Sequence, residues 1–504
     1  MTFQSIRSRF LGTLLAGLSM TTLSSLEPAR AENNSDDLAS VGLTLHWEAN
    51  VGGAPLANGS QSFVLWSHTT EKREYVTVRS GSRIIERIRG EEVDQKKLDQ
   101  AIISGEKILK TPRLGLEGAT EKAQKLVATY KTLGRNVDIE PYSQRIVYAV
   151  TLTSNGILES MDAESGTVLW RTEAGKSTLP MFGPGVSDDY VVVTNGNVFY
   201  VYELATGNIV TSRNLAFTPT ACPTVLGDKV IVPSVDGRLV AYDIKKAEIA
   251  PGIIRTGTEN RLGVVISADR EFFAWPTGSR LIQAKMDKLP MLWNAVGLHE
   301  PILSLPIATQ SGFLASTELG TVFHCSTGRE DSLFWKTRLA VQVSHPPLAN
   351  KELAFIVSDE GNLFALRMQD GSNAWGHQPR NIKDIIAVGK KHIYVKDSSN
   401  SLVVIDLASG LESGRSNLIL PTVVPNKITD RLVFVTKQGQ VTCLREIDAT
   451  VPSFMTEMNA EGTAASVTPK KTEEPSTTKM DDDTNVFEGA GSTTTSGDDP
   501  FKID

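Results

Sequence analysis

The chain has 504 residues, with 51 basic and 58 acidic side chains and a formal net charge of −7. Binding to nucleic-acid phosphates requires a local excess of Lys and Arg, so this balance argues against nucleic acid as a partner. With 40% hydrophobic residues, the chain has enough apolar side chains for the folded core of two or three domains.

Residues 1–31 have the pattern of a signal peptide. Arg7 and Arg9 precede a mostly apolar run, and Ala29 and Ala31 provide the small residues of a cleavage site. No other stretch approaches the ~20 uninterrupted apolar residues of a transmembrane helix. We therefore expect an exported bacterial protein, periplasmic or secreted, without a transmembrane segment.

Residues 60–142 combine strand and helix patterns and do not follow the repeat found in the rest of the chain. Alternating side chains predict two strands at 72–79 and 82–88, and a helix is expected at 91–103. An apolar stripe at helical spacing predicts an amphipathic helix over 119–133. Together these elements indicate a small inserted α+β subdomain.

The predicted helix at 119–133 and the turn after it carry four basic residues, Lys122, Lys125, Lys131 and Arg135. They could form a basic docking face, although a solvated helix face is the commoner explanation of such residues.

A repeat of about 41 residues covers residues 145–447. A polar turn ending in Gly separates two alternating segments, and a second turn leads to a strand that often ends in Trp. Gly accepts the positive φ of a tight hairpin turn without a Cβ clash. The first turns recur every 39–42 residues, at Gly156, Gly196, Gly237, Gly278, Gly320, Gly361, Asn400 and Gly439.

About 41 residues make one four-stranded antiparallel sheet, and such sheets stack around an axis as a propeller. Eight copies therefore predict an all-β fold, an eight-bladed β-propeller of four-stranded antiparallel sheets. The last copy ends near Glu446 without an outer strand, so we predict that an isolated strand at 43–52 completes it and closes the ring. Aromatic residues at the ends of outer strands are expected to wedge between blades, namely Trp47, Trp170, Trp293, Trp335 and Trp375.

Residues 448–504 form an acidic tail rich in Ser and Thr, with 12 acidic and 4 basic residues and few large apolar side chains. Such a segment buries too little apolar surface to offset its conformational entropy, so we expect it to be disordered.

The repeats resemble those of the PQQ-like repeat β-propeller family, best matched by Asp-Ala-Glu-Ser-Gly-Thr-Val-Leu-Trp at 162–170. By layout the chain resembles the outer-membrane assembly factors of the BamB type within that family, which are exported eight-bladed propellers. The resemblance covers residues 145–447 and implies a non-catalytic scaffold that binds a protein partner in the cell envelope. The sequence departs from that type in three ways: no cysteine near residue 31 to carry a lipid, the insertion, and the tail.

The same family includes PQQ-dependent dehydrogenases, in which the quinone lies between a Trp and a disulfide of adjacent cysteines, beside a calcium ion. Here Cys222, Cys325 and Cys443 are far apart, and the sequence has neither a G-x-S-x-G nucleophile elbow nor clustered zinc ligands. We therefore expect no catalytic residue and no cofactor, neither PQQ nor calcium. A quinoprotein dehydrogenase and a propeller that binds a glycan or small molecule remain the alternatives to a scaffold.

Overall fold

The computed structural model of the chain describes residues 36–55, 62–81, 83–104, 112–287, 290–327 and 333–455. All of them belong to the first of two units, Met1–Asn459 and Ala460–Asp504. The predicted signal peptide at 1–31 and nearly all of the predicted tail at 448–504 lie outside the described residues. Among the described helices, none is long and apolar enough to cross a membrane.

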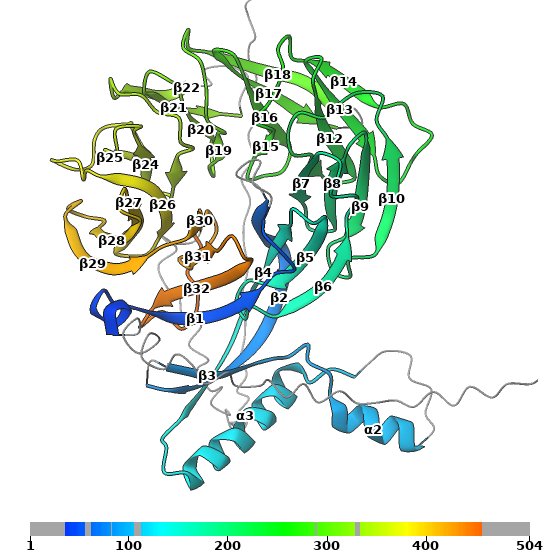
Figure 1. Cartoon of the computed structure of the whole chain (residues 1–504), viewed down its shortest axis with the longest axis vertical. Coiled ribbons are helices and arrows are strands. Elements are labelled where there is room, and N and C mark those ends of the chain that lie inside the picture. Colours follow the sequence, from blue (N-terminus) through cyan, green and yellow to red (C-terminus); the bar gives the residue numbers. More distant parts are fainter. Residues whose placement is uncertain are drawn as a thin grey trace, which may run out of the picture. The chain divides into compact units, whose positions relative to one another are not determined.

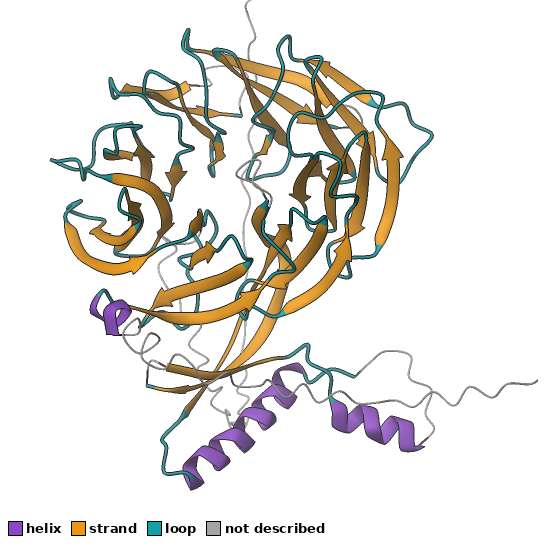
Figure 2. Cartoon of the chain, in the orientation of Figure 1, coloured by secondary structure: helices purple, strands orange, loops and turns teal. Residues whose placement is uncertain are grey.

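Eight antiparallel β-sheets, which we call blades 1–8 in chain order, form a ring in the described part of the chain (Figure 1). Helices are few and occur before the first strand and in the insertion, whereas the ring itself consists of strands and loops (Figure 2). The prediction of an all-β, eight-bladed propeller is therefore confirmed.

Blades 2, 3 and 4 each consist of four consecutive strands, the first innermost in the ring and the fourth outermost. Blade 2 contains β7 (Met181–Val186), β8 (Tyr190–Asn195), β9 (Val198–Glu203) and β10 (Ile209–Asn214). Blade 3 contains β11 (Thr224–Leu226), β12 (Lys229–Ser234), β13 (Arg238–Asp243) and β14 (Gly252–Arg255). Blade 4 contains β15 (Val265–Ile266), β16 (Phe272–Thr277), β17 (Arg280–Met286) and β18 (Pro290–Gly297).

Blades 5 and 7 also follow this pattern, whereas blade 6 has three strands. Blade 5 contains β19 (Ile307–Ala308), β20 (Gly312–Ser316), β21 (Thr321–Ser326) and β22 (Leu333–Arg338). Blade 6 contains β23 (Leu348–Ala349), β24 (Leu353–Val357) and β25 (Leu363–Arg367). Blade 7 contains β26 (Ile382–Val388), β27 (His392–Asp397), β28 (Ser401–Asp406) and β29 (Glu412–Ile419).

The outer strand of blade 6 is reduced to a single bridge between Leu366 and Asn373, which differs from the four strands expected in every blade. The segment after this bridge contains Gly376 and Pro379. Gly and Pro are unfavourable in a paired strand, which accounts for the missing ladder.

Blade 1 and the insertion share one five-stranded sheet, of order β3-β2-β4-β5-β6. Its strands are β2 (Phe63–Ser80), β3 (Arg83–Arg89), β4 (Asp138–Leu152), β5 (Ile157–Asp162) and β6 (Val168–Glu173). Residues 63–67 pair with 147–151 as the inner strand of blade 1, and the same two strands then continue outward, where 72–79 pair with 138–145. The insertion is therefore the extended connection between the first two strands of blade 1. Its boundary differs from the expected residue 60, because residues 63–67 belong to the ring.

Two helices complete the insertion, α2 (Gln95–Ser104) and α3 (Gly115–Thr132). Helix α3 buries Ala119 and Ala123 against Val76, Val78 and Ile88 of the sheet. The apolar stripe read from the sequence therefore faces β2 and β3.

Blade 8 is closed by a strand from the beginning of the chain. It contains β30 (Thr422–Val424), β31 (Leu432–Val435), β32 (Gln440–Glu446) and, outermost, β1 (Leu43–Asn50). Strand β1 pairs antiparallel with β32 from Leu43 opposite Glu446 to Asn50 opposite Gln440. The strand that carries Trp47 thus lies in the last blade. We call the boundary between blades 8 and 1 the seam.

The core consists of apolar layers between neighbouring blades. In the described residues, a separate buried cluster fills each of the eight boundaries, including the seam. Between blades 3 and 4, for example, Ile231 and Leu239 meet Phe273 and Trp275. Burial between every pair of neighbours is the main free-energy term that holds such a ring together.

Candidate functional site

The eight turn residues identified from the repeat all lie in the hairpin between the second and third strands of a blade. All have positive φ, from 55° at Gly278 to 89° at Gly439, with Asn400 at 64°. At Gly156 a Cβ would also lie 2.7 Å from the carbonyl oxygen of Gly175. These residues therefore supply the backbone conformation that each hairpin of a blade requires.

The five tryptophans of the repeat lie between blades. Each indole N–H donates a hydrogen bond to a carbonyl oxygen in the following blade. The pairs are Trp47–Ala163 (3.0 Å), Trp170–Leu204 (2.7 Å), Trp293–Thr327 (2.6 Å), Trp335–Met368 (2.8 Å) and Trp375–Leu407 (2.9 Å).

A second series of glycines, which the sequence reasoning missed, receives these indoles. Gly207 lies under Trp170, where a Cβ would be 2.5 Å from Cε3 of the ring. Gly166, Gly371 and Gly410 lie in the same way under Trp47, Trp335 and Trp375. A glycine 35–37 residues after Trp170, Trp335 and Trp375 was the signal that could have revealed this contact, whereas Trp47 precedes its glycine by 119 residues.

A buried ionic cluster lies at the seam, and we call it the seam cluster: Glu164, His46, Arg87 and Arg431. Oε1 of Glu164 is 3.1 Å from Nη2 of Arg431, 3.2 Å from Nη2 of Arg87 and 3.0 Å from Nε2 of His46. Arg87 also donates to the carbonyl oxygen of Glu164 at 2.7 Å. Glu164 lies in the turn between β5 and β6, His46 in β1, Arg87 in β3 and Arg431 in the loop before β31. The carboxylate of Glu164 therefore joins four segments of the chain.

The electrostatics of the seam cluster follow from its burial. The side chains of Glu164, Arg87 and Arg431 are 4%, 7% and 3% exposed, and that of His46 is fully buried. Burial alone would raise the pKa of Glu164, but the two guanidinium groups and His46 hold that pKa well below its ordinary value. Loss of hydration lowers the pKa of His46 to about 3, so the imidazole is neutral at physiological pH.

A second ionic group fixes the foot of the insertion to blade 1. Arg73, 3% exposed, contacts Oδ2 of Asp162 at 3.1 Å and Oε2 of Glu91 at 2.9 Å. The hydroxyl of Tyr75 donates to Asp162 at 3.1 Å. The insertion is therefore held to the ring through charges on one face of the hairpin formed by β2 and β3, the face opposite to the one that packs against α3.

A polar cluster beside the inner strands of blades 1, 2 and 4 joins these three blades. Trp66 of blade 1 donates from Nε1 to Asp188 of blade 2 at 3.0 Å, and Thr69 also donates to that carboxylate. Arg270 of blade 4 pairs with Asp188 and lies 4.7 Å from the centre of the Trp66 ring. These residues satisfy one another, and one face of Trp66 is already covered.

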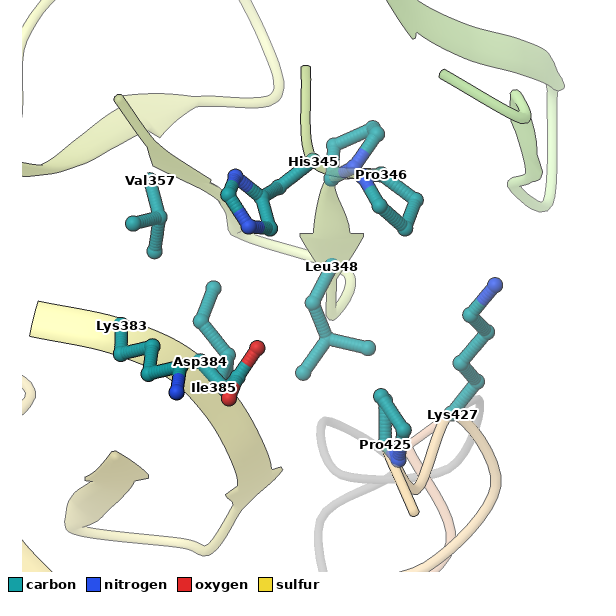
Figure 3. A pocket seen from close by; sticks show the side chains of 10 residues that line it. His345, Pro346, Leu348, Val357, Lys383, Asp384, Ile385, Pro425 and Lys427 are labelled. Atoms are coloured by element: carbon teal, nitrogen blue, oxygen red, sulfur yellow. The ribbon is translucent and has the colours of Figure 1, made fainter. Parts of the chain in front are cut away.

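A small pocket lies between the inner strands of blades 6, 7 and 8. It encloses about 50 Å³ and is lined by Leu348, Ile385 and prolines, with Lys383 and Asp384 on one side and Lys427 on the other (Figure 3). This volume is too small for the three fused rings of PQQ.

A calcium ion beside PQQ would need a cluster of oxygen ligands among the described residues. They contain no group of three or more His, Cys, Asp or Glu side chains placed to hold a metal. The guanidinium group of Arg270 covers one face of the Trp66 ring.

The insertion exposes two kinds of surface. Helix α2 buries none of its residues, and its Ile102 and Ile103 are 63% and 85% exposed. On α3, Lys122 pairs with Glu92 at 2.8 Å and Lys125 with Glu121 at 2.8 Å. The basic docking face considered from the sequence is therefore partly neutralised by its own neighbours, whereas the apolar end of α2 is open.

Comparison with known proteins gave a family match and many similar solved structures. A family model described as outer membrane protein assembly factor BamB matches residues 154–250 and 263–449. The crystal structure of BamB from Moraxella catarrhalis is 19% identical over 59% of this chain and 91% of that chain, with a TM-score of 0.47. The crystal structure of the computationally designed Ika8 protein is 14% identical over 59% of this chain and 92% of that chain, with a TM-score of 0.42. The comparison with curated proteins gave no match.

Proposed function

Because this chain belongs to the family described as outer membrane protein assembly factor BamB, as the resemblance of its repeats indicated, we propose that it is a protein-interaction scaffold. In this proposal the chain is exported, works in the cell envelope without catalysis or cofactor, and uses its propeller as a rigid support. The insertion is the part that distinguishes it, since the matched residues 154–250 and 263–449 do not include it.

The observation that carries the proposal is helix α2. A helix of ten residues is marginally stable on its own in water, and most helices in proteins are stabilised by packing an apolar face. Helix α2 has the apolar residues Leu98, Ala101 and Ile102 at helical spacing, yet none of its residues is buried. A protein partner with an apolar groove would cover this face, as in other helix-in-groove complexes.

The mounting of the insertion supports the same function. Strands β2 and β4 both continue from blade 1 into the insertion, with a register shift between Ser67 and Lys72, and Arg73 and Arg87 tie the insertion to the ring through buried ion pairs. The β2–β3 hairpin from which α2 follows is therefore a firm base, and it loses little further conformational freedom when a partner binds α2. The excess of acidic over basic residues, 58 against 51, favours a protein over a nucleic acid as that partner.

The test is site-specific photo-cross-linking in the native host. A benzophenone side chain at position 103 should give an adduct with one envelope protein, and the additional change Ile102→Asp should abolish it. Because Ile102 is already 63% exposed, this change should leave the ring folded, which circular dichroism would check.

A matched control places the same group at Leu133, which is 66% exposed at the end of α3. An adduct that appears equally from position 133, or that survives Ile102→Asp, contradicts docking through α2. Dye-linked dehydrogenase activity after addition of PQQ and Ca²⁺ would contradict the non-catalytic role and favour the quinoprotein alternative.

A further inference from the structure

Glu164 is the point at which the insertion, the ring-closing strand and both blades of the seam meet. Its carboxylate contacts Arg87 of β3, His46 of β1 and Arg431 of blade 8. Nη1 of Arg87 also lies 3.1 Å from Nε2 of His46, so the insertion contacts the ring-closing strand directly.

The C-terminal segment of the described chain enters the same cluster. Arg431 donates to the carbonyl oxygens of Ala449 and Thr450 at 3.0 and 3.1 Å, and Arg87 reaches the carbonyl of Thr450 at 3.5 Å. Asp430, 2% exposed, lies 3.3 Å from Arg431 and adds a second carboxylate. The seam cluster therefore holds β1, β3 and the segment after β32 in one buried network.

Opening any one of these segments affects the others. If β1 leaves, His46 is removed from Glu164 and water reaches the ion pairs with Arg87 and Arg431. If β3 leaves, Glu164 loses one of its two guanidinium partners while it is still shielded from water. A buried charge left without its partner is strongly unfavourable, so partial opening is disfavoured relative to joint opening.

We propose that the insertion is the latch of the ring: β1 and the β2–β3 hairpin open together, and the contact of Arg87 with Glu164 couples them. This gives the insertion a conformational role independent of any docking through α2. A ligand that stabilises the insertion would also stabilise the closed ring, because both segments open in one step.

Hydrogen exchange of the full-length protein, followed by mass spectrometry, tests the latch. In the unaltered protein, the amides of β1 (Leu43–Asn50) and of β3 (Arg83–Arg89) should show the same free energy of opening. Arg87→Met keeps the length of the side chain and removes its charge. It should accelerate exchange in β1 about a hundredfold, although β1 itself is unchanged.

Lys229→Met in blade 3 is the matched control, since Lys229 forms a similarly shielded pair with Asp243 at 2.6 Å far along the chain from the seam. It should leave exchange in β1 unchanged. If Arg87→Met accelerates exchange only in β3 and α3, the insertion opens independently of β1, and the proposal is wrong.

The conservative variant Arg87→Lys covers the case in which Arg87→Met fails to fold. Lys keeps one charge but loses the paired contacts to Glu164, so the acceleration in β1 should be intermediate. Exchange in β1 equal to that of the unaltered protein would overturn the proposal in this variant as well.

Discussion

The boundary between blades 3 and 4 and the seam between blades 8 and 1 are both contacts between neighbouring blades, but they are built from different kinds of side chain. Between blades 3 and 4, aliphatic and aromatic side chains such as Ile231, Leu239 and Phe273 form the buried contact. The seam has an apolar layer too, with Trp47 and Val147, but adds the ionic seam cluster around Glu164.

The difference follows from how the two boundaries are connected. Blades 3 and 4 are consecutive in the chain, so a short connection already fixes their relative position. At the seam, β1 must find β32 across almost the entire chain, and a slip by one residue would turn Trp47 away from blade 1. Ion pairs are directional, and they can specify one arrangement where an apolar layer accepts several.

The largest expected effect is at Glu164. Glu164→Gln leaves Arg87 and Arg431 buried with one counter-charge fewer, and we expect the free energy of unfolding to fall by about 3–5 kcal/mol. Urea unfolding measures this change. The control Glu271→Gln removes an exposed pair with Lys285, where a loss of less than about 1 kcal/mol is expected. Equal losses in the two variants would show that the seam cluster has no special role.

The next effect concerns the glycines that receive the indoles. Gly207 has a φ of 73°, and a Cβ there would lie 2.5 Å from Trp170, so Gly207→Ala combines backbone strain with overpacking. We expect a loss of about 3 kcal/mol. Gly227 has a φ of 56° but open space around it, so Gly227→Ala should lose only about 1 kcal/mol through strain alone. Thermal unfolding monitored by Trp fluorescence compares the two, and a similar loss in both would contradict the close Trp–Gly contact.

A pH effect distinguishes the seam from the ring surface. Burial lowers the pKa of His46 from 6.5 to about 3, so between these values the unfolded chain takes up a proton that the folded protein does not. The contribution of His46 is complete above pH 6.5 and falls as the pH drops toward 3, by about 1.4 kcal/mol per pH unit.

The variant His46→Gln should therefore have a stability that falls less steeply between pH 7 and pH 5, where the expected difference is about 2 kcal/mol. The exposed His299 supplies the control variant His299→Gln. Urea midpoints at several pH values measure both, and identical slopes for His46→Gln and the unaltered protein would be evidence against a neutral buried imidazole.

The smallest effect is that of a single hydrogen bond between blades. Trp335→Phe keeps an aromatic ring but removes the N–H that donates to the carbonyl oxygen of Met368 at 2.8 Å, and we expect a loss of about 1 kcal/mol. Trp47→Phe removes the equivalent bond to Ala163 at the seam and should lose about the same amount. A much larger loss for Trp47→Phe would mean that the seam depends on its indole more than on its charges.

The ring could be predicted from the sequence because its signals are local and repeated. The turn residues from Gly156 to Gly439 need a positive φ within a few residues of two alternating strands, so each blade carries its own marker. The same holds for Trp170 and Trp335, which lie in the outer strands of blades 1 and 5. The missing outer strand of blade 6 could not be read in this way, because the Trp375 marker is retained while the strand before it is reduced to one bridge.

The seam cluster could not be predicted, because its residues are scattered along the chain. Glu164 is separated from His46 by 118 positions and from Arg431 by 267. Each of these side chains, taken alone, reads as an ordinary polar residue in a turn or strand. Only the closed ring brings them together, and the same is true of Trp66, Asp188 and Arg270 from blades 1, 2 and 4.

The claim that the insertion and the ring-closing strand act as one unit is tested most directly by a double-mutant cycle on Arg87→Met and His46→Gln. We predict a coupling energy of about 1 kcal/mol or more in the free energy of unfolding, since both side chains contact Glu164 and each other. Losses that add to within about 0.5 kcal/mol would contradict this coupling and show that the insertion and the strand are held independently.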